Sequence, residues 1–231
     1  MNYKKYLSEI SVSIILLLIV LATIFYGDYL AAKHITIRQW NFNNLLFVLP
    51  FMPLLFLQEK ASLPSVGTIN LKKAGWMSTF GVGMIFGLLD LIVVKIMMHP
   101  EPYTEMPPFL QPFPYSIFLY SSGALEIELY YRMMPLTIVL LINNLLFKGK
   151  YQNILFIILG IITSLIEPIQ QFPEGAVWFI VYATLSGIAM NAWQFRSYLK
   201  YGFLASLAVR LGHYLIWHIL LGIYVQYIEL L

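Results

Sequence analysis

The sequence predicts an all-α protein: a polytopic transmembrane helix bundle of about seven spans, forming a single integral membrane domain over residues 1–231. Of the 231 residues, 60% are hydrophobic and only 11% are charged, whereas about a quarter of a soluble domain is charged. The mean hydropathy is +0.76, and the apolar runs are long and unbroken instead of alternating. So few polar residues cannot cover a water-facing surface, so a lipid bilayer is the expected solvent.

Charge and cysteine content exclude several functions. The net charge of +3 is too small to indicate a nucleic-acid partner. The chain has no cysteine, which excludes disulfides, thiolate metal sites and a cysteine nucleophile.

The expected spans follow the apolar segments, which are residues 10–31, 42–58, 74–98, 115–147, 151–170, 175–195 and 203–229. No small-residue cleavage site follows the first segment, so we expect a retained span and not a signal peptide. The second is short, and Pro50 and Pro53 predict a kink in it. The fourth would be about 50 Å long as one helix, and Pro135 predicts a bend there.

The connecting segments predict that the N-terminus is cytoplasmic. With seven spans, the N-terminal side holds nine basic residues: Lys4, Lys5, Lys60, Lys72, Lys73, Lys148, Lys150, Arg196 and Lys200. The other side holds fewer basic residues and most of the acids: Lys33, Arg38 and Lys95, with Asp28, Glu101, Glu105, Glu174 and Glu229. This positive-inside bias predicts a multi-pass protein of a prokaryotic cytoplasmic membrane, with residues 99–114 as an external loop.

Eight ionisable residues remain inside the expected spans: Asp90, Glu126, Glu128, Arg132, Glu167, Arg210, His213 and His218. A charge at the centre of a bilayer costs about 2.5–3.5 kcal/mol on insertion scales. Such residues usually face the bundle interior, pair with one another and mark functional sites. These eight are therefore the candidate functional residues.

The fourth span carries Glu128 and Arg132 four residues apart, on one helical face. Arg132 is expected to hold Glu128 ionised and oriented. Glu126 lies about 200° around the helix from Glu128 at 100° per residue, so the two carboxylates are not expected at one small site. A structural ion pair and a functional pair both fit this spacing.

In the fifth span, Glu167 directly precedes Pro168, which is expected to end or bend the helix. Two interpretations of Glu167 are open. It lies either at the outer water interface or in a site with Thr163 and Ser164, which are polar in an otherwise apolar run.

The last span places Arg210, His213 and Trp217 on one stripe, at 100° per residue. His218 lies about 140° from His213 on the same helix, so the spacing does not support joint ligation of a metal. No cofactor is expected, and a divalent metal has no support from ligand spacing. Asp90, in the third span, is a candidate partner for one of the two buried arginines.

These motifs resemble, in order and spacing, the CAAX-protease and bacteriocin-processing family of intramembrane glutamic proteases (the Abi family). Its members carry Glu-Glu-x-x-x-Arg, then Phe-x-x-x-His, then His-x-x-x-Asn or Asp. Residues 128–132 match the second Glu and the Arg, and His213 matches the third motif. The chain departs from the pattern at Ile127 (first Glu), Glu167 (second-motif His) and Trp217 (Asn or Asp).

The resemblance covers about residues 115–225 and implies an intramembrane endopeptidase, in which a Glu and a His activate water and the last pair binds the oxyanion. The implied catalytic residues are Glu126, Glu128, Arg132, Glu167, His213 and His218, with Arg210 and Asp90 in supporting positions. Glu128 or Glu167 would be the base, and one histidine the proton donor or oxyanion stabiliser.

Three functions remain open. The chain could be a divergent peptidase that acts on a membrane-embedded peptide or protein. It could instead be an inactive scaffold, such as a bacteriocin-immunity or partner-binding protein, whose ion pair only holds helices together. A proton-coupled transporter is the third, because intramembrane acids and histidines also form proton relays. The absence of an internal repeat in the sequence disfavours it.

Overall fold

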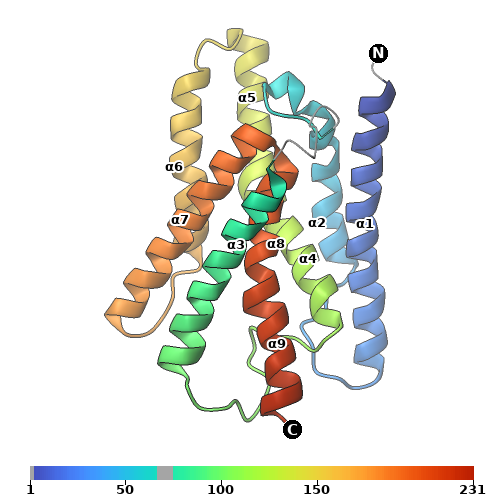
Figure 1. The fold of residues 1–231 in the computed structure, drawn as a ribbon. Coiled ribbons are helices and arrows are strands. Elements are labelled where there is room, and N and C mark those ends of the chain that lie inside the picture. The colour runs from blue at the N-terminus through green and yellow to red at the C-terminus, as the bar shows by residue number, and fades with distance from the viewer. Residues whose placement is uncertain (1–2, 67–74) are drawn as a thin grey trace.

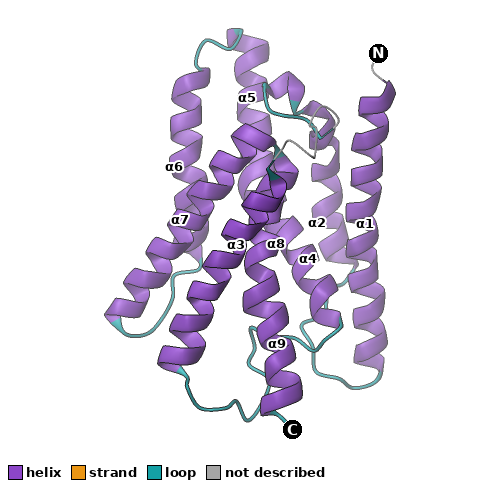
Figure 2. Cartoon of the chain, in the orientation of Figure 1, coloured by secondary structure: helices purple, strands orange, loops and turns teal. Residues whose placement is uncertain are grey.

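The computed structural model describes residues 3–66 and 75–231, and those residues form helices and loops without a β-strand (Figure 2). The prediction of an all-α fold is confirmed. The first three helical rods are α1 (Tyr3–Ala32); α2 (Phe42–Val48), continued by a 3-10 helix (Leu49–Leu57); and α3 (Trp76–Asp90), continued by a π-helix (Leu91–Met98). A short 3-10 helix (Glu59–Ala61) follows the second rod.

Four further rods complete the seven (Figure 1). The fourth runs from α4 (Tyr115–Glu128) through a π-helix (Leu129–Met133) into α5 (Met134–Phe147). The next two are α6 (Gln152–Gln170) and α7 (Val177–Tyr201). The last is α8 (Phe203–Tyr214), a π-helix (Leu215–Leu220), α9 (Leu221–Tyr224) and a final π-helix (Val225–Glu229).

Among the described residues, four helices are long and apolar enough to cross a membrane: Tyr6–Ala32, Met77–Met98, Gln152–Gln170 and Phe203–Glu229. Their outer faces are apolar. On α6, for example, Ile157 and Ile161 are both more than half exposed. Long apolar helices with apolar outer faces indicate contact with a lipid bilayer and a multi-pass membrane protein.

Prolines disturb the helices at two of the three predicted places. The α-helical geometry of the second rod ends at Val48, next to Pro50, and Pro53 lies inside the 3-10 helix that follows. In the fourth rod, a π-helix immediately precedes the turn that contains Pro135. At Pro168, where the helix was expected to end or bend, α6 continues to Gln170, so the helix does not end at this proline.

Helices α3 and α8 pack closely because glycines face each other across the contact. A Cβ atom on Gly83 would lie 1.8 Å from the carbonyl oxygen of Val209, and one on Gly212 would lie 2.1 Å from that of Phe80. Small residues permit such backbone approach between membrane helices. The contact brings the end of α3, with Asp90, against the end of α8, with His213.

Replacing Gly83 by alanine is expected to destabilise the protein by about 1–3 kcal/mol, since the added methyl group overpacks a backbone contact. Gly81→Ala is the matched control: it lies on the same helix, and nothing lies within 4 Å of its added Cβ. The measurement is the free energy of unfolding in mixed detergent micelles. Equal stability of the two variants would contradict the close approach of α3 and α8.

Candidate functional site

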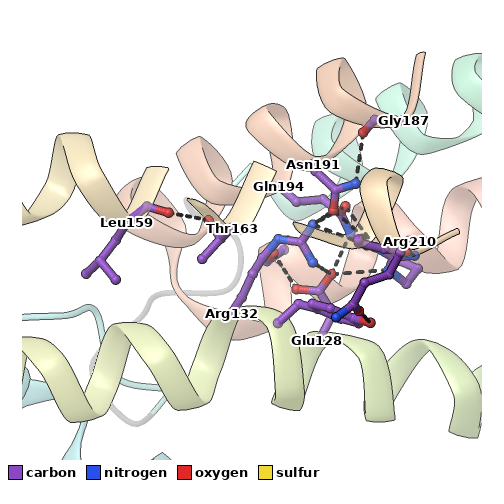
Figure 3. A network of polar contacts seen from close by, with 12 residues as sticks. Glu128, Arg132, Leu159, Thr163, Gly187, Asn191, Gln194 and Arg210 are labelled. Carbon is purple, nitrogen blue, oxygen red and sulfur yellow. Dashed lines mark hydrogen bonds and ion pairs between the residues drawn. The ribbon is translucent and has the colours of Figure 1, made fainter. Parts of the chain in front are cut away.

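Two carboxylates and two guanidinium groups form a closed polar network in the centre of the bundle (Figure 3). Glu128 and Arg132 come from the fourth rod, Glu167 from α6 and Arg210 from α8. All four side chains are buried, with at most 5% of each residue exposed. The formal charges of the four groups cancel, as a dry interior requires.

Glu128 accepts four hydrogen bonds. Its Oε1 accepts from Arg132 Nη1 at 2.6 Å, from Gln194 Nε2 at 2.5 Å and from Arg210 Nε at 3.4 Å. Its Oε2 accepts from the hydroxyl of Ser206 at 2.6 Å. Each carboxylate oxygen has about two lone-pair sites, so the donors fill Oε1, whereas Oε2 accepts only from Ser206.

Glu167 is held by a bidentate contact with Arg210. Nη1 donates to Oε1 at 2.7 Å and Nη2 to Oε2 at 2.5 Å, which is the strong fork geometry of arginine and carboxylate. Arg132 Nη2 lies 4.0 Å from the same Oε2. Glu167 is buried in this network, with 5% of the residue exposed. Thr163, by contrast, donates only to the carbonyl of Leu159 in its own helix.

Helix α7 contributes two amides that were not predicted from the sequence. The side-chain oxygen of Asn191 accepts from Arg132 Nη2, and that of Gln194 accepts from the same nitrogen at 2.7 Å. Asn191 also donates to the carbonyl of Gly187 at 2.8 Å. The available signal was their spacing: two amides three residues apart share one face of an otherwise apolar helix.

Asp90 binds His213 and Tyr182, so the prediction that it pairs with a buried arginine is wrong. His213 Nε2 lies 2.7 Å from Asp90 Oδ2, and the Tyr182 hydroxyl donates to Oδ1 at 2.7 Å. Both arginines are already neutralised by Glu128 and Glu167, and the close contact of α3 with α8 places His213 nearer.

The other ring nitrogen of His213, Nδ1, is buried and has no hydrogen-bond partner among the described residues. Because a carboxylate only accepts hydrogen bonds, Nε2 carries a proton, and Nδ1 of the neutral ring is an acceptor. His213 and Asp90 therefore have the arrangement of a general base and its orienting acid.

His218 lies beside His213, and the prediction that the two histidines occupy separate faces is wrong. Their ring centroids are 6.3 Å apart. The cause is the π-helix at Leu215–Leu220, whose wider i→i+5 turn brings residues five apart back to one face. The Nδ1–H of His218 donates to the carbonyl of Phe109 at 2.9 Å, and its ring stacks on Tyr120 at 4.2 Å.

Two adjoining cavities surround His218. The first, which we call the polar cavity, has a volume of about 290 Å³ and includes Glu167, Asn191, Arg210, His213, Trp217 and His218 in its wall. The second, the aromatic cavity, has a volume of about 440 Å³ and includes Arg38, Trp40, Phe109, Tyr120 and Glu126. Both are lined by Gln171, Tyr214 and His218.

The candidate residues therefore divide into three groups. Glu167, Arg210 and the two histidines line the polar cavity, with Asp90 behind His213. Glu126 lines the aromatic cavity. Glu128 and Arg132 line neither of these cavities. Within the described part of the chain, no group of three or more histidine, aspartate or glutamate side chains is arranged to hold a metal ion.

Comparison with protein-family models, with curated proteins and with solved structures finds no match for this chain. The resemblance to the glutamic-protease family therefore stays a prediction that rests on the motifs alone.

Proposed function

We propose that this chain is a divergent intramembrane peptidase of the CAAX-protease type, which hydrolyses peptide bonds at the polar cavity. The observation that carries the proposal is His213. Asp90 orients its ring, its Nδ1 has no partner among the described residues, and its side chain is part of the cavity wall. A buried ring nitrogen without a partner is costly. Nδ1 itself has almost no exposed surface, so in our proposal the ring turns toward the cavity, where a water or a substrate group becomes its partner.

The proposed reaction uses His213 as the base in place of a glutamate. His213 Nδ1 removes a proton from water as the water oxygen bonds to the peptide carbonyl carbon. The carbonyl oxygen becomes an oxyanion, which the nearby cation of Arg210 stabilises. The carbon–nitrogen bond then breaks, and the proton on Nδ1 passes to the leaving amine. Asp90 holds the imidazolium that forms between these two steps.

This assignment differs from the mechanism that the resemblance implies. Ile127 stands at the position of the family's first glutamate and cannot activate water. Glu128 is held by donors from four side chains and lines neither the polar nor the aromatic cavity. Glu128 and Arg132 thus have a structural role in our proposal, and the reaction takes place at the polar cavity instead.

The proposed topology has seven spans with a cytoplasmic N-terminus. Successive rods run in alternating directions, and the two termini lie at opposite ends of the bundle (Figure 1). The turn between α5 and α6, with Lys148 and Lys150, lies at the N-terminal end, as Figure 1 shows. Lys72 and Lys73, which the charge argument also used, lie outside the described residues. Gln171 and Pro173 of the α6–α7 loop line the polar cavity, so the cavity lies toward the outer side.

A second candidate is an inactive scaffold that binds a partner protein, and the position of Glu128 outside both cavities favours it. If the chain is such a scaffold, the purified protein binds its partner but cleaves no peptide. The polar network would then serve only to fix the packing of the fourth rod, α6, α7 and α8.

The test is hydrolysis by the protein purified into lipid nanodiscs. Membrane-spanning and outer-leaflet peptides are supplied in H₂¹⁸O, and products are identified by mass spectrometry. We expect one ¹⁸O atom in each new carboxylate. A His213→Gln protein prepared identically controls for a contaminating peptidase. The proposal fails if no peptide is cleaved or if both preparations cleave equally.

A further inference from the structure

The aromatic cavity is built mainly from rings. Trp40 precedes α2, Phe109 lies in the loop before α4, and Tyr120 and Tyr214 come from α4 and α8. His218 and Tyr120 stack face to face at 4.2 Å, and the Tyr120 hydroxyl donates to the Phe109 carbonyl at 2.6 Å. These contacts hold the aromatic wall in place.

Glu126 is the acid that neither the buried network nor the proposed reaction uses. It is half-buried in the wall of the aromatic cavity. No hydrogen bond or ion pair joins it to another side chain in the described part of the chain. A carboxylate inside a membrane helix usually has a cationic partner. Arg38 lies in the same cavity wall and attracts Glu126 electrostatically, but no hydrogen bond or ion pair joins the two side chains, so the carboxylate can still accept a cation in direct contact.

The rings around Glu126 also favour a cation. The faces of tryptophan and tyrosine attract ammonium and guanidinium groups at about 6 Å or less from the ring centroid. The guanidinium carbon of Arg38 already lies 5.5 Å from the centroid of Tyr120. Arg38 is exposed at the cavity wall and tethered by its backbone, whose N–H donates to Gln111 Oε1 at 2.6 Å.

We infer that the aromatic cavity binds a basic side chain of the peptide substrate, with Glu126 as its counter-ion. This inference rests on the proposed function, because the shared wall of Gln171, Tyr214 and His218 places the cavity beside the polar cavity. A lysine close to the scissile bond then lies in the aromatic cavity while the bond itself lies near His213. The substrate class is a peptide with a basic residue close to the cleaved bond.

Two charge-removing variants must act in opposite directions if the ligand is a cation. Glu126→Gln keeps the shape of the side chain and removes the counter-ion, so it weakens binding. Arg38→Gln removes a like charge from the same wall, so binding of the cation is unchanged or tighter. For an anionic ligand the effects would be reversed: Glu126→Gln would strengthen binding and Arg38→Gln would weaken it. Each variant is therefore the matched control of the other.

The experiment measures the dissociation constant of a lysine-containing peptide and of its norleucine counterpart, in nanodiscs of phosphatidylglycerol. The host is the His213→Gln protein, which does not turn the peptide over. We expect the lysine peptide to bind at least 10-fold tighter, the preference to disappear with Glu126→Gln, and the preference to persist with Arg38→Gln. Equal binding of the two peptides, or loss of the preference with Arg38→Gln, would overturn the inference.

Two further arms distinguish a peptide side chain from a lipid headgroup, and binding from cleavage. Nanodiscs that contain phosphatidylethanolamine offer a lipid ammonium group; if that lipid abolishes peptide binding and needs Glu126, the ligand is a headgroup and the peptide assignment is wrong. Cleavage by the unmodified protein is measured on the same peptide pair. Charge-dependent binding without cleavage would support the cavity and reject the proposed hydrolysis, whereas cleavage without charge preference would reject the cavity assignment alone.

Discussion

Replacing Arg132 by methionine is expected to destabilise the folded protein by about 3–5 kcal/mol, the usual cost of removing one partner from a buried ion pair. Arg132 is fully buried and donates to Glu128, Asn191 and Gln194. Its loss leaves two carboxylates facing the single cation of Arg210. Because Glu128 lines neither cavity, water does not reach the carboxylate that loses its arginine.

Two variants make this prediction specific. Arg196→Met is the same substitution on an exposed arginine of α7, and it should change stability by no more than about 0.5 kcal/mol. Glu128→Met combined with Arg132→Met removes one charge of each sign, and it should recover much of the lost stability. The free energy of unfolding in mixed micelles measures all three. A double variant no more stable than Arg132→Met alone would mean that charge balance does not govern the site.

The pair at the centre of this network could be predicted from sequence because its geometry is local. Glu128 and Arg132 are four residues apart in a helix, and i, i+4 side chains meet regardless of the tertiary fold. The contact between Glu167 and Arg210 joins residues 43 positions apart. No helical periodicity relates α6 to α8, so the sequence could only offer both residues as unpaired candidates.

The histidine pair shows where a helical pattern misleads. The wrong assignment to two faces followed from 100° per residue, which holds for an α-helix but not for the π-helix at Leu215–Leu220. Apolar runs look alike in both kinds of helix, since hydropathy records the solvent and not the hydrogen-bond register. For the same reason the apolar run predicted the last rod at 203–229, while its three changes of helical geometry were invisible.

Asp90 shows that a sequence can mark a functional candidate without revealing its partner. Its charge and depth marked it as a functional candidate, but its partner depends on the close packing of α3 against α8. Gly83 and Gly212 permit that packing, and glycines in an apolar helix do not reveal which helix they face. Asn191 and Gln194 were overlooked because uncharged amides do not stand out in a count of ionisable groups.

Replacing His213 by glutamine is expected to lower the rate of peptide hydrolysis by about 10²–10⁴-fold, the usual contribution of a positioned general base. Glutamine retains a polar group for Asp90 but has no nitrogen that can accept the proton of water. The rate is measured under single-turnover conditions in nanodiscs. His99→Gln is the matched control, because His99 lies in the loop before α4 and lines neither the polar nor the aromatic cavity. It should retain the full rate.

Asp90 acts through His213, so its substitution separates positioning from support of the fold. In Asp90→Asn the amide N–H can face Nε2, which moves the ring proton to Nδ1 and removes the acceptor that water needs. The expected loss is about 10²-fold, and the ¹⁵N chemical shifts of the imidazole should report the changed tautomer. Tyr182→Phe leaves the Asp90 carboxylate in place, so it should lower the rate of hydrolysis much less than Asp90→Asn does. Unchanged tautomer and rate in Asp90→Asn would return the choice of base to Glu167 or Glu128, the two carboxylates that the sequence offered for that role.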